Sequence, residues 1–134
     1  MFLGGATTVF LFKEVKLMKQ DDVSRQYQIP IEILKEYESW GLCDVVKIVM
    51  GEWQYDDQDL ERLSTIMALH DLDFSHDEIE TYMRLLLEDA HGEEKCMKLL
   101  TAKRQKKLAD IHLQEKKLQR IDYLRHVIKK NQTN

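Results

Sequence analysis

The last third of the chain constrains the fold most, because residues 93–134 contain neither proline nor glycine. Without these helix breakers, one helix of roughly 35 to 40 residues, about 55 Å long at 1.5 Å per residue, is predicted. Its apolar residues recur at spacings of three, four or seven and form one narrow seam, which consists of Met97, Leu100, Leu108, Ile111, Leu118, Ile121, Leu124 and Ile128. The rest of the chain is too short to cover this seam. We therefore expect the same helix of a second chain to cover it, with the first seven of these residues in the dimer interface.

The charges of the chain are segregated behind a net charge of −4. Residues 18–92 hold six Lys or Arg against eighteen Asp or Glu, whereas residues 93–134 hold twelve against five. A length of 134 residues with 43% apolar content suits one compact domain plus an extended element. We predict an extension in residues 1–17, an acidic head in residues 18–92, and a basic dimerisation helix with a short tail in residues 93–134.

The opening residues, "MFLGGATTVFLF", are apolar, but no basic residue precedes them and no small-residue cleavage site follows. The run is also too short to span a bilayer, so we expect a loosely attached extension, with Met18 as an alternative start, and no membrane partner. The two cysteines, Cys43 and Cys96, lie far apart without C-x-x-C spacing. This pattern is typical of reduced thiols in a cytoplasmic protein.

Two short helices joined by a tight turn are predicted at the start of the head. Asp21 or Asp22 can cap the first, which runs through "VSRQYQ". Pro30 suits the first turn of the second, which we expect to end at Gly41. Its apolar positions fall at helical spacing and are Ile33, Leu34, Tyr37 and Trp40.

From Val45 the pattern changes to a small β-hairpin, because "VVKIV" is β-branched, Met50-Gly51 can turn and "EWQY" alternates. Such a hairpin after a helix-turn-helix is a wing. Asp56 then caps a third helix, whose apolar stripe is Leu60, Leu63, Ile66, Met67 and Leu69. A fourth helix starts at the capping-box pair Ser75 and Glu78 and is expected to close at Gly92; its buried face is Ile79, Tyr82, Met83, Leu86 and Leu87.

No catalytic, metal or cofactor site is predicted. The five histidines show no ligand spacing, and Cys96 has no second thiolate near it in the sequence. No Ser-His-Asp set or carboxylate pair is recognisable either, so an enzyme is not expected. The basic residues after Gly92 are those expected around a coiled-coil seam, which favours a solvated face over a nucleic-acid patch.

The stretches "ILKEYESWGL" and "YDDQDLERLSTIMALHDLDFSHDEI", together with the long terminal helix, resemble the MerR family of bacterial transcription regulators. The resemblance covers about residues 18–130. It implies a mainly α-helical fold, with a winged helix-turn-helix head and a small β-hairpin wing, whose long helices pair as an antiparallel coiled coil in a homodimer. It also implies double-stranded promoter DNA, bound at two half-sites, and RNA polymerase as partners.

The resemblance places the DNA contacts in the two helices of the helix-turn-helix and in the wing. Carried over to this sequence, the predicted contact residues are Arg25, Glu32, Lys35, Glu36, Tyr37, Lys47, Trp53 and Gln54. Some positions depart from the family pattern: Glu36 replaces the first tyrosine of the recognition helix, and Trp53 replaces the arginine of the wing that would bind phosphate. Asp73 stands where a turn glycine is usual, in a conformation that Asp tolerates.

Two functions therefore remain open. The first is a cytoplasmic, homodimeric transcription regulator of MerR type on a roughly two-fold-symmetric site. The alternative is a protein-interaction module, because DNA affinity comes largely from Lys and Arg and an acidic head repels phosphate. The charge around the recognition helix discriminates between them.

Overall fold

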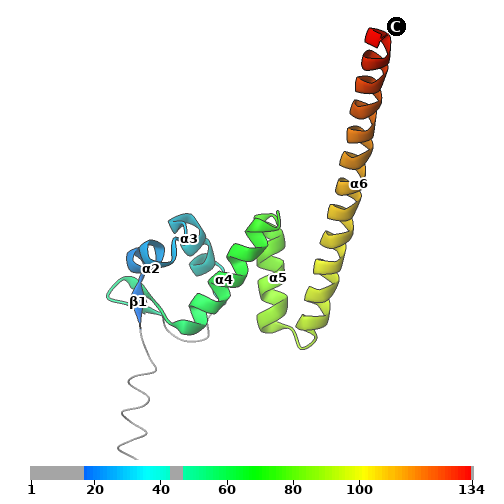
Figure 1. The fold of residues 1–134 in the computed structure, drawn as a ribbon. Coiled ribbons are helices and arrows are strands. Elements are labelled where there is room, and N and C mark those ends of the chain that lie inside the picture. The colour runs from blue at the N-terminus through cyan, green and yellow to red at the C-terminus, as the bar shows by residue number, and fades with distance from the viewer. Residues whose placement is uncertain (1–16, 43–46, 134) are drawn as a thin grey trace, which may run out of the picture. The chain divides into compact units, whose positions relative to one another are not determined.

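The computed structural model describes residues 17–42 and 47–133, and its chain divides into two compact units between Glu88 and Asp89 (Figure 1). We call the first unit the head and the second the tail, and describe each by itself. The described elements of the head are β1 (Met18–Lys19), α2 (Gln20–Tyr27), α3 (Ile31–Ser39), β2 (Ile48–Val49), β3 (Glu52–Tyr55), α4 (Asp57–Asp71) and α5 (His76–Glu88). The tail is α6 (Gly92–Thr133).

The predicted helix-turn-helix is formed by α2 and α3. The turn passes through Gln28, whose left-handed φ of 56° ends α2, and Ser24 closes it by donating its hydroxyl to the carbonyl of Ile29 at 2.7 Å. The start of α2 differs from the prediction, because it lies at Gln20 rather than after Asp21 or Asp22. Both carboxylates instead occupy the first turn, where they are favoured by the positive end of the helix dipole.

The wing is the predicted hairpin, with one strand more. The turn residues Met50 and Gly51 both have positive φ, 54° and 80°, as a two-residue turn between twisted antiparallel strands requires. Ile48 pairs with Trp53 across it. The other edge of β3 pairs with β1, so the sheet has the order β1-β3-β2. Strand β1 was not predicted, because two residues are too few for an alternating pattern.

The third and fourth predicted helices both form, but Leu86, expected on the buried face of α5, is 36% exposed. Asp56 and Asp59 make a reciprocal capping box at the start of α4, and Ser75 and Glu78 make the corresponding pair of bonds at α5. Between these helices Asp73 has a φ of 65°, the left-handed geometry expected of it. The head buries two charged residues, Lys47 and Asp59. The hydrophobic residues of its core are Val23, Ile29, Leu34, Tyr37, Trp40, Leu42, Tyr55, Leu63, Ile66, Leu69, Phe74, Ile79 and Met83.

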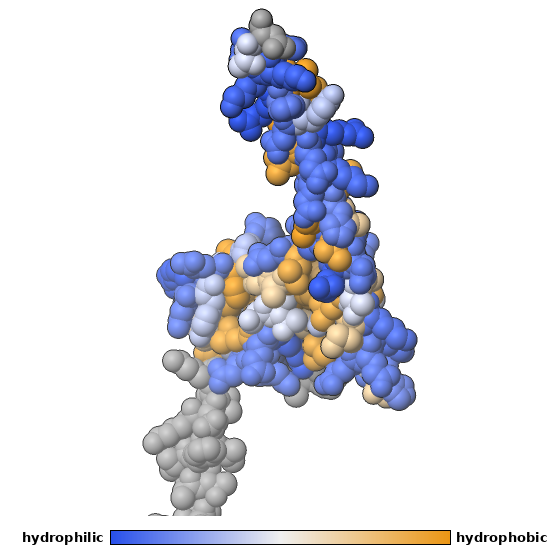
Figure 2. Space-filling model, turned by 45° about the vertical axis from the view of Figure 1, so that its right-hand side comes forward, coloured by the Kyte–Doolittle hydropathy of each residue, from blue (hydrophilic) through white to orange (hydrophobic). Residues whose placement is uncertain are grey.

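The tail is one helix of 42 residues, about 63 Å long, somewhat longer than predicted. Gly92 begins this helix and does not close α5, which already ends at Glu88, so the expected role of Gly92 was wrong. Figure 2 shows hydrophobic side chains at intervals along the long helix, among hydrophilic ones. Within the described residues, no helix has both the length and the apolar character needed to cross a membrane.

Candidate DNA-binding surface

The outward side of α3 carries Glu32, Lys35 and Ser39, which follow one another at helical spacing and are all exposed. Among the described residues Lys35 makes no ion pair, so its ammonium group is available for a phosphate or a base edge. Glu36 lies beside it, but its carboxylate is turned toward His76 at 2.8 Å. Lys35 is therefore the basic feature of this helix.

The inward side of α3 is fixed by a buried polar contact. Tyr37 is 1% exposed and its hydroxyl donates to Oδ1 of Asp59, also 1% exposed, at 2.6 Å. Arg62 adds a longer bond to the same hydroxyl at 3.4 Å. With so little exposure, Tyr37 orients α3 from inside the core. Its predicted DNA contact stays a prediction.

Lys47 is likewise buried, and its predicted DNA contact also stays a prediction. Its side chain is 8% exposed, and its Nζ lies 2.7 Å from Asp59 and 2.9 Å from Asp56. Burial by itself lowers the pKa of Lys47, but the bonds to the two carboxylates outweigh it and hold the pKa above its usual value. A buried carboxylate needs such a partner, so Lys47 neutralises the cap of α4.

The wing packs against α3 through aromatic rings. The Trp53 ring meets Tyr37 edge-on, with centroids 6.2 Å apart, and lies 6.1 Å from Tyr55 at a tilt of 42°. Trp53 is half-buried, and its Nε1 has no hydrogen-bond partner within the described residues. The tryptophan in place of the family's arginine thus contributes to packing between wing and recognition helix.

A second polar link connects β3 with both helices of the helix-turn-helix. The Tyr55 hydroxyl donates to Oε1 of Glu38, and Nε2 of Gln20 donates to the same oxygen at 3.3 Å. Burial, followed by the bond to the Glu38 carboxylate, raises the pKa of the Tyr55 hydroxyl. Gln20, Glu38 and Asp59 were all missed as positioning residues, because their partners lie 17 to 22 residues away in the sequence.

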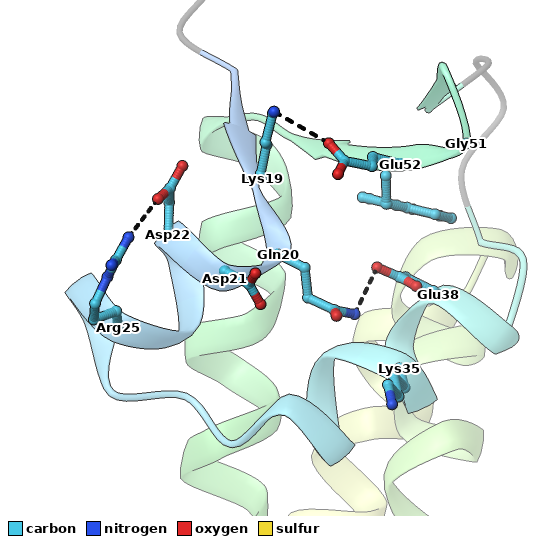
Figure 3. A pocket seen from close by; sticks show the side chains of 10 residues that line it. Lys19, Gln20, Asp21, Asp22, Arg25, Lys35, Glu38, Gly51 and Glu52 are labelled. Atoms are coloured by element: carbon cyan, nitrogen blue, oxygen red, sulfur yellow. Dashed lines mark hydrogen bonds and ion pairs between the residues drawn. The ribbon is translucent and has the colours of Figure 1, made fainter.

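The helix-turn-helix and the wing together enclose an open cavity of about 590 Å³, shown in Figure 3. Its lining includes three cations, Lys19, Arg25 and Lys35, and four carboxylates, Asp21, Asp22, Glu38 and Glu52. Two of the cations are already paired: Arg25 with Asp22 at 2.7 Å and Lys19 with Glu52 at 3.3 Å. The surface is therefore not a basic groove.

The remaining predicted contacts stay predictions, and they differ in exposure. Arg25, Glu32 and Lys35 are exposed, while Glu36, Trp53 and Gln54 are half-buried. The cavity brings Arg25, Lys35 and Trp53 together from α2, α3 and β3. It also includes Lys19, which was not a predicted contact because β1 was not predicted.

The predicted dimer residues lie along α6 as one series, of which five are exposed. Met97, Ile111, Leu118, Ile121 and Leu124 are each more than half exposed, whereas Leu100 and Leu108 are half-buried. Large apolar side chains exposed at this spacing are typical of a coiled-coil seam.

Comparison with known proteins agrees with this architecture. The family model "MerR HTH family regulatory protein" matches residues 18–86, which are just over half of the chain. No curated relative matches the sequence.

Two solved structures share the fold. A MerR-family transcriptional regulator from Bacillus thuringiensis matches with a TM-score of 0.57 and 18% identity. The match covers 80% of this chain and 95% of the solved chain. HiNmlR, a MerR-family regulator lacking the sensor domain and bound to promoter DNA, matches with a TM-score of 0.61 and 18% identity. That match covers 81% of this chain and 86% of the solved chain. With the helix-turn-helix, the wing and the long helix in place, the chain belongs to the MerR family of helix-turn-helix regulatory proteins.

Proposed function

We propose that this protein is a DNA-binding transcriptional regulator that acts as a homodimer on a roughly two-fold-symmetric promoter site. Each head occupies one half-site, with α3 in the major groove and the wing beside it. The observation that carries the proposal is Lys35, which is exposed and makes no ion pair within residues 17–42 and 47–133, on the outward side of a helix that Tyr37 and Asp59 fix from within. RNA polymerase at the promoter is the expected second partner, and the cytoplasm is the expected location.

Support comes from the family and from the tail. Members matched by the family model are regulatory proteins, and HiNmlR is bound to promoter DNA. The apolar series on α6 provides a surface for a second copy, and two heads on one dimer suit two half-sites one helical turn apart.

The experiment is fluorescence anisotropy of the full chain with random duplex DNA at rising salt, followed by selection of bound fragments from genomic DNA. A DNA-binding head loses affinity as salt increases, with a logarithmic slope of about 0.9 for each phosphate neutralised. Recovery of a common two-fold-symmetric sequence would support the regulator.

One observation favours a second candidate, a protein-interaction module with the same fold. The cavity beside α3 has more carboxylates than cations, and two of its three cations are paired internally. Such a head suits a basic partner. No binding to any duplex at low salt would reject the regulator and leave this alternative.

A further inference from the structure

Three side chains with metal-binding groups converge from three helices of the head. Glu36 lies in α3, His70 near the end of α4, and His76 is the first residue of α5. One ligand atom from each lies within 4.8 Å of the others. Nδ1 of His76 is 2.8 Å from Oε2 of Glu36, and the centroids of the His70 and His76 rings are 5.3 Å apart.

This cluster includes a polar atom that lacks a partner. Nε2 of His70 is buried and has no hydrogen-bond partner within the described residues. A buried polar atom without a partner is costly, and an imidazole nitrogen that carries no proton can offer its lone pair to a metal ion. The unpartnered nitrogen is thus an observation independent of the clustering itself.

The chemistry of the set is specific. Two imidazoles and one carboxylate form a known zinc ligand set that leaves a fourth position open, and imidazole also suits Co²⁺ and Ni²⁺. Metal–ligand bonds of about 2.0 to 2.1 Å in a tetrahedral site place ligand atoms roughly 3.3 Å apart. The three ligand atoms lie within 4.8 Å of one another, so to reach this spacing no pair needs to approach by more than about 1.5 Å. His76 can supply this movement, because its side chain is 72% exposed.

We propose that Glu36, His70 and His76 bind one Zn²⁺-class transition-metal ion. The ion would join the recognition helix α3 to the corner between α4 and α5, one residue after Lys35. Its coordinate bonds would reinforce the link between α3 and α5 that the Glu36–His76 contact already makes. The proposal does not depend on DNA binding, so its test is a test of metal binding alone.

Sequence spacing gave no sign of this site, because Glu36 and His76 are 40 residues apart. Without metal, the same contact is an ion pair whenever His76 is protonated. A metal ion binds the neutral imidazole, so binding is measured at about pH 7.5.

The experiment is titration of the full, metal-free chain with Co²⁺, followed by visible absorbance, and displacement by Zn²⁺. One Co²⁺ per chain, with the ligand-field bands of a tetrahedral nitrogen and oxygen site and no thiolate charge-transfer band, is expected. The absent thiolate band separates this site from Cys96.

Three variants locate the ion. His76→Ala and Glu36→Gln should each weaken Co²⁺ affinity at least tenfold, because each removes one ligand of three. The control is His112→Ala, which removes an exposed histidine of α6 and should leave affinity unchanged. His70→Gln should also weaken binding, and melting of each variant in chelator checks that it is folded.

Wild-type affinity equal to that of His76→Ala and Glu36→Gln would overturn the proposal, as would loss of binding in His112→Ala alone. If His70→Gln does not fold, the exposed His76 and the isosteric change at Glu36 still decide the question.

Discussion

The hydroxyl of Tyr37 donates a 2.6 Å hydrogen bond to the buried carboxylate of Asp59, linking the recognition helix to the first turn of α4. The same carboxylate lies 2.7 Å from Nζ of Lys47, which precedes the wing. Recognition helix, wing and α4 therefore share one buried charge. The Tyr37 hydroxyl and the Lys47 ammonium both bind this charge. We therefore expect these two partners to determine the stability of the head and the orientation of α3.

Tyr37→Phe should lower the free energy of unfolding by about 1.5 to 3 kcal/mol, because the buried carboxylate loses one of its donors. Urea unfolding followed by circular dichroism measures the change. Tyr27→Phe is the matched control, since Tyr27 is 46% exposed and should change stability by less than about 0.5 kcal/mol. Equal effects of the two substitutions would contradict the role given to Asp59.

Lys47→Met should lower the free energy of unfolding by about 3 kcal/mol, because Asp59 remains buried without its cation. The comparison is Lys35→Met, the same change at an exposed lysine, with an expected cost near zero. If both variants unfold at the same urea concentration, the ion pair contributes nothing to stability.

The stabilising effect of the Lys47 pair should depend on pH. Burial alone raises the pKa of Asp56, but the bonds from Lys47 and from the backbone of Asp59 bring it below its usual 3.8. This contribution is present above about pH 4 and is lost as pH falls through the lowered pKa. The pKa of Lys47 is raised above 10.5, so its contribution is present below that pH and lost as pH rises further.

The stability difference between wild type and Lys47→Met should therefore be largest between about pH 5 and pH 9 and shrink on both sides. Urea titrations at a series of pH values measure this difference. A difference that stays constant down to about pH 2 would contradict the ionic origin.

The double substitution Ile111→Asp and Leu118→Asp should convert dimers to monomers in sedimentation velocity, because it places two charges in the proposed seam. His112→Asp and Gln119→Asp are the control, each one residue later and so about 100° around the helix. The control should remain dimeric. A monomeric wild type at micromolar concentration would reject the coiled coil.

Lys35→Ala should weaken binding to the selected DNA by about 1 to 3 kcal/mol, and should flatten the salt dependence by about one unit if its contact is a phosphate. Glu32→Arg should strengthen binding to any duplex if Glu32 merely repels phosphate, or relax specificity at one base pair if it accepts from cytosine. Lys116→Ala, in the middle of α6, serves as the control. Equal affinities for Lys35→Ala and wild type would remove Lys35 from the contact surface.

The sequence by itself determined the local structure. Absence of proline and glycine after Gly92 specifies the long helix, the Asp56–Asp59 and Ser75–Glu78 spacings specify two helix starts, and Met50-Gly51 specifies the hairpin turn. These features depend on residues within a few positions of each other, where backbone geometry and capping act directly.

Only the tertiary structure decided which side chains serve the core and which face outward. Tyr37 and Lys47 have residue types suited to DNA, yet both are buried and both bind the carboxylate of Asp59. The carboxylate of Glu36 lies near two histidines from other helices. Burial and ion pairing depend on groups brought together over 12 to 40 residues, and helical periodicity identifies only the face of a helix on which a residue lies, not its partner. For that reason the sequence predicted the recognition helix, but the packed head determined which of its residues remain available for binding.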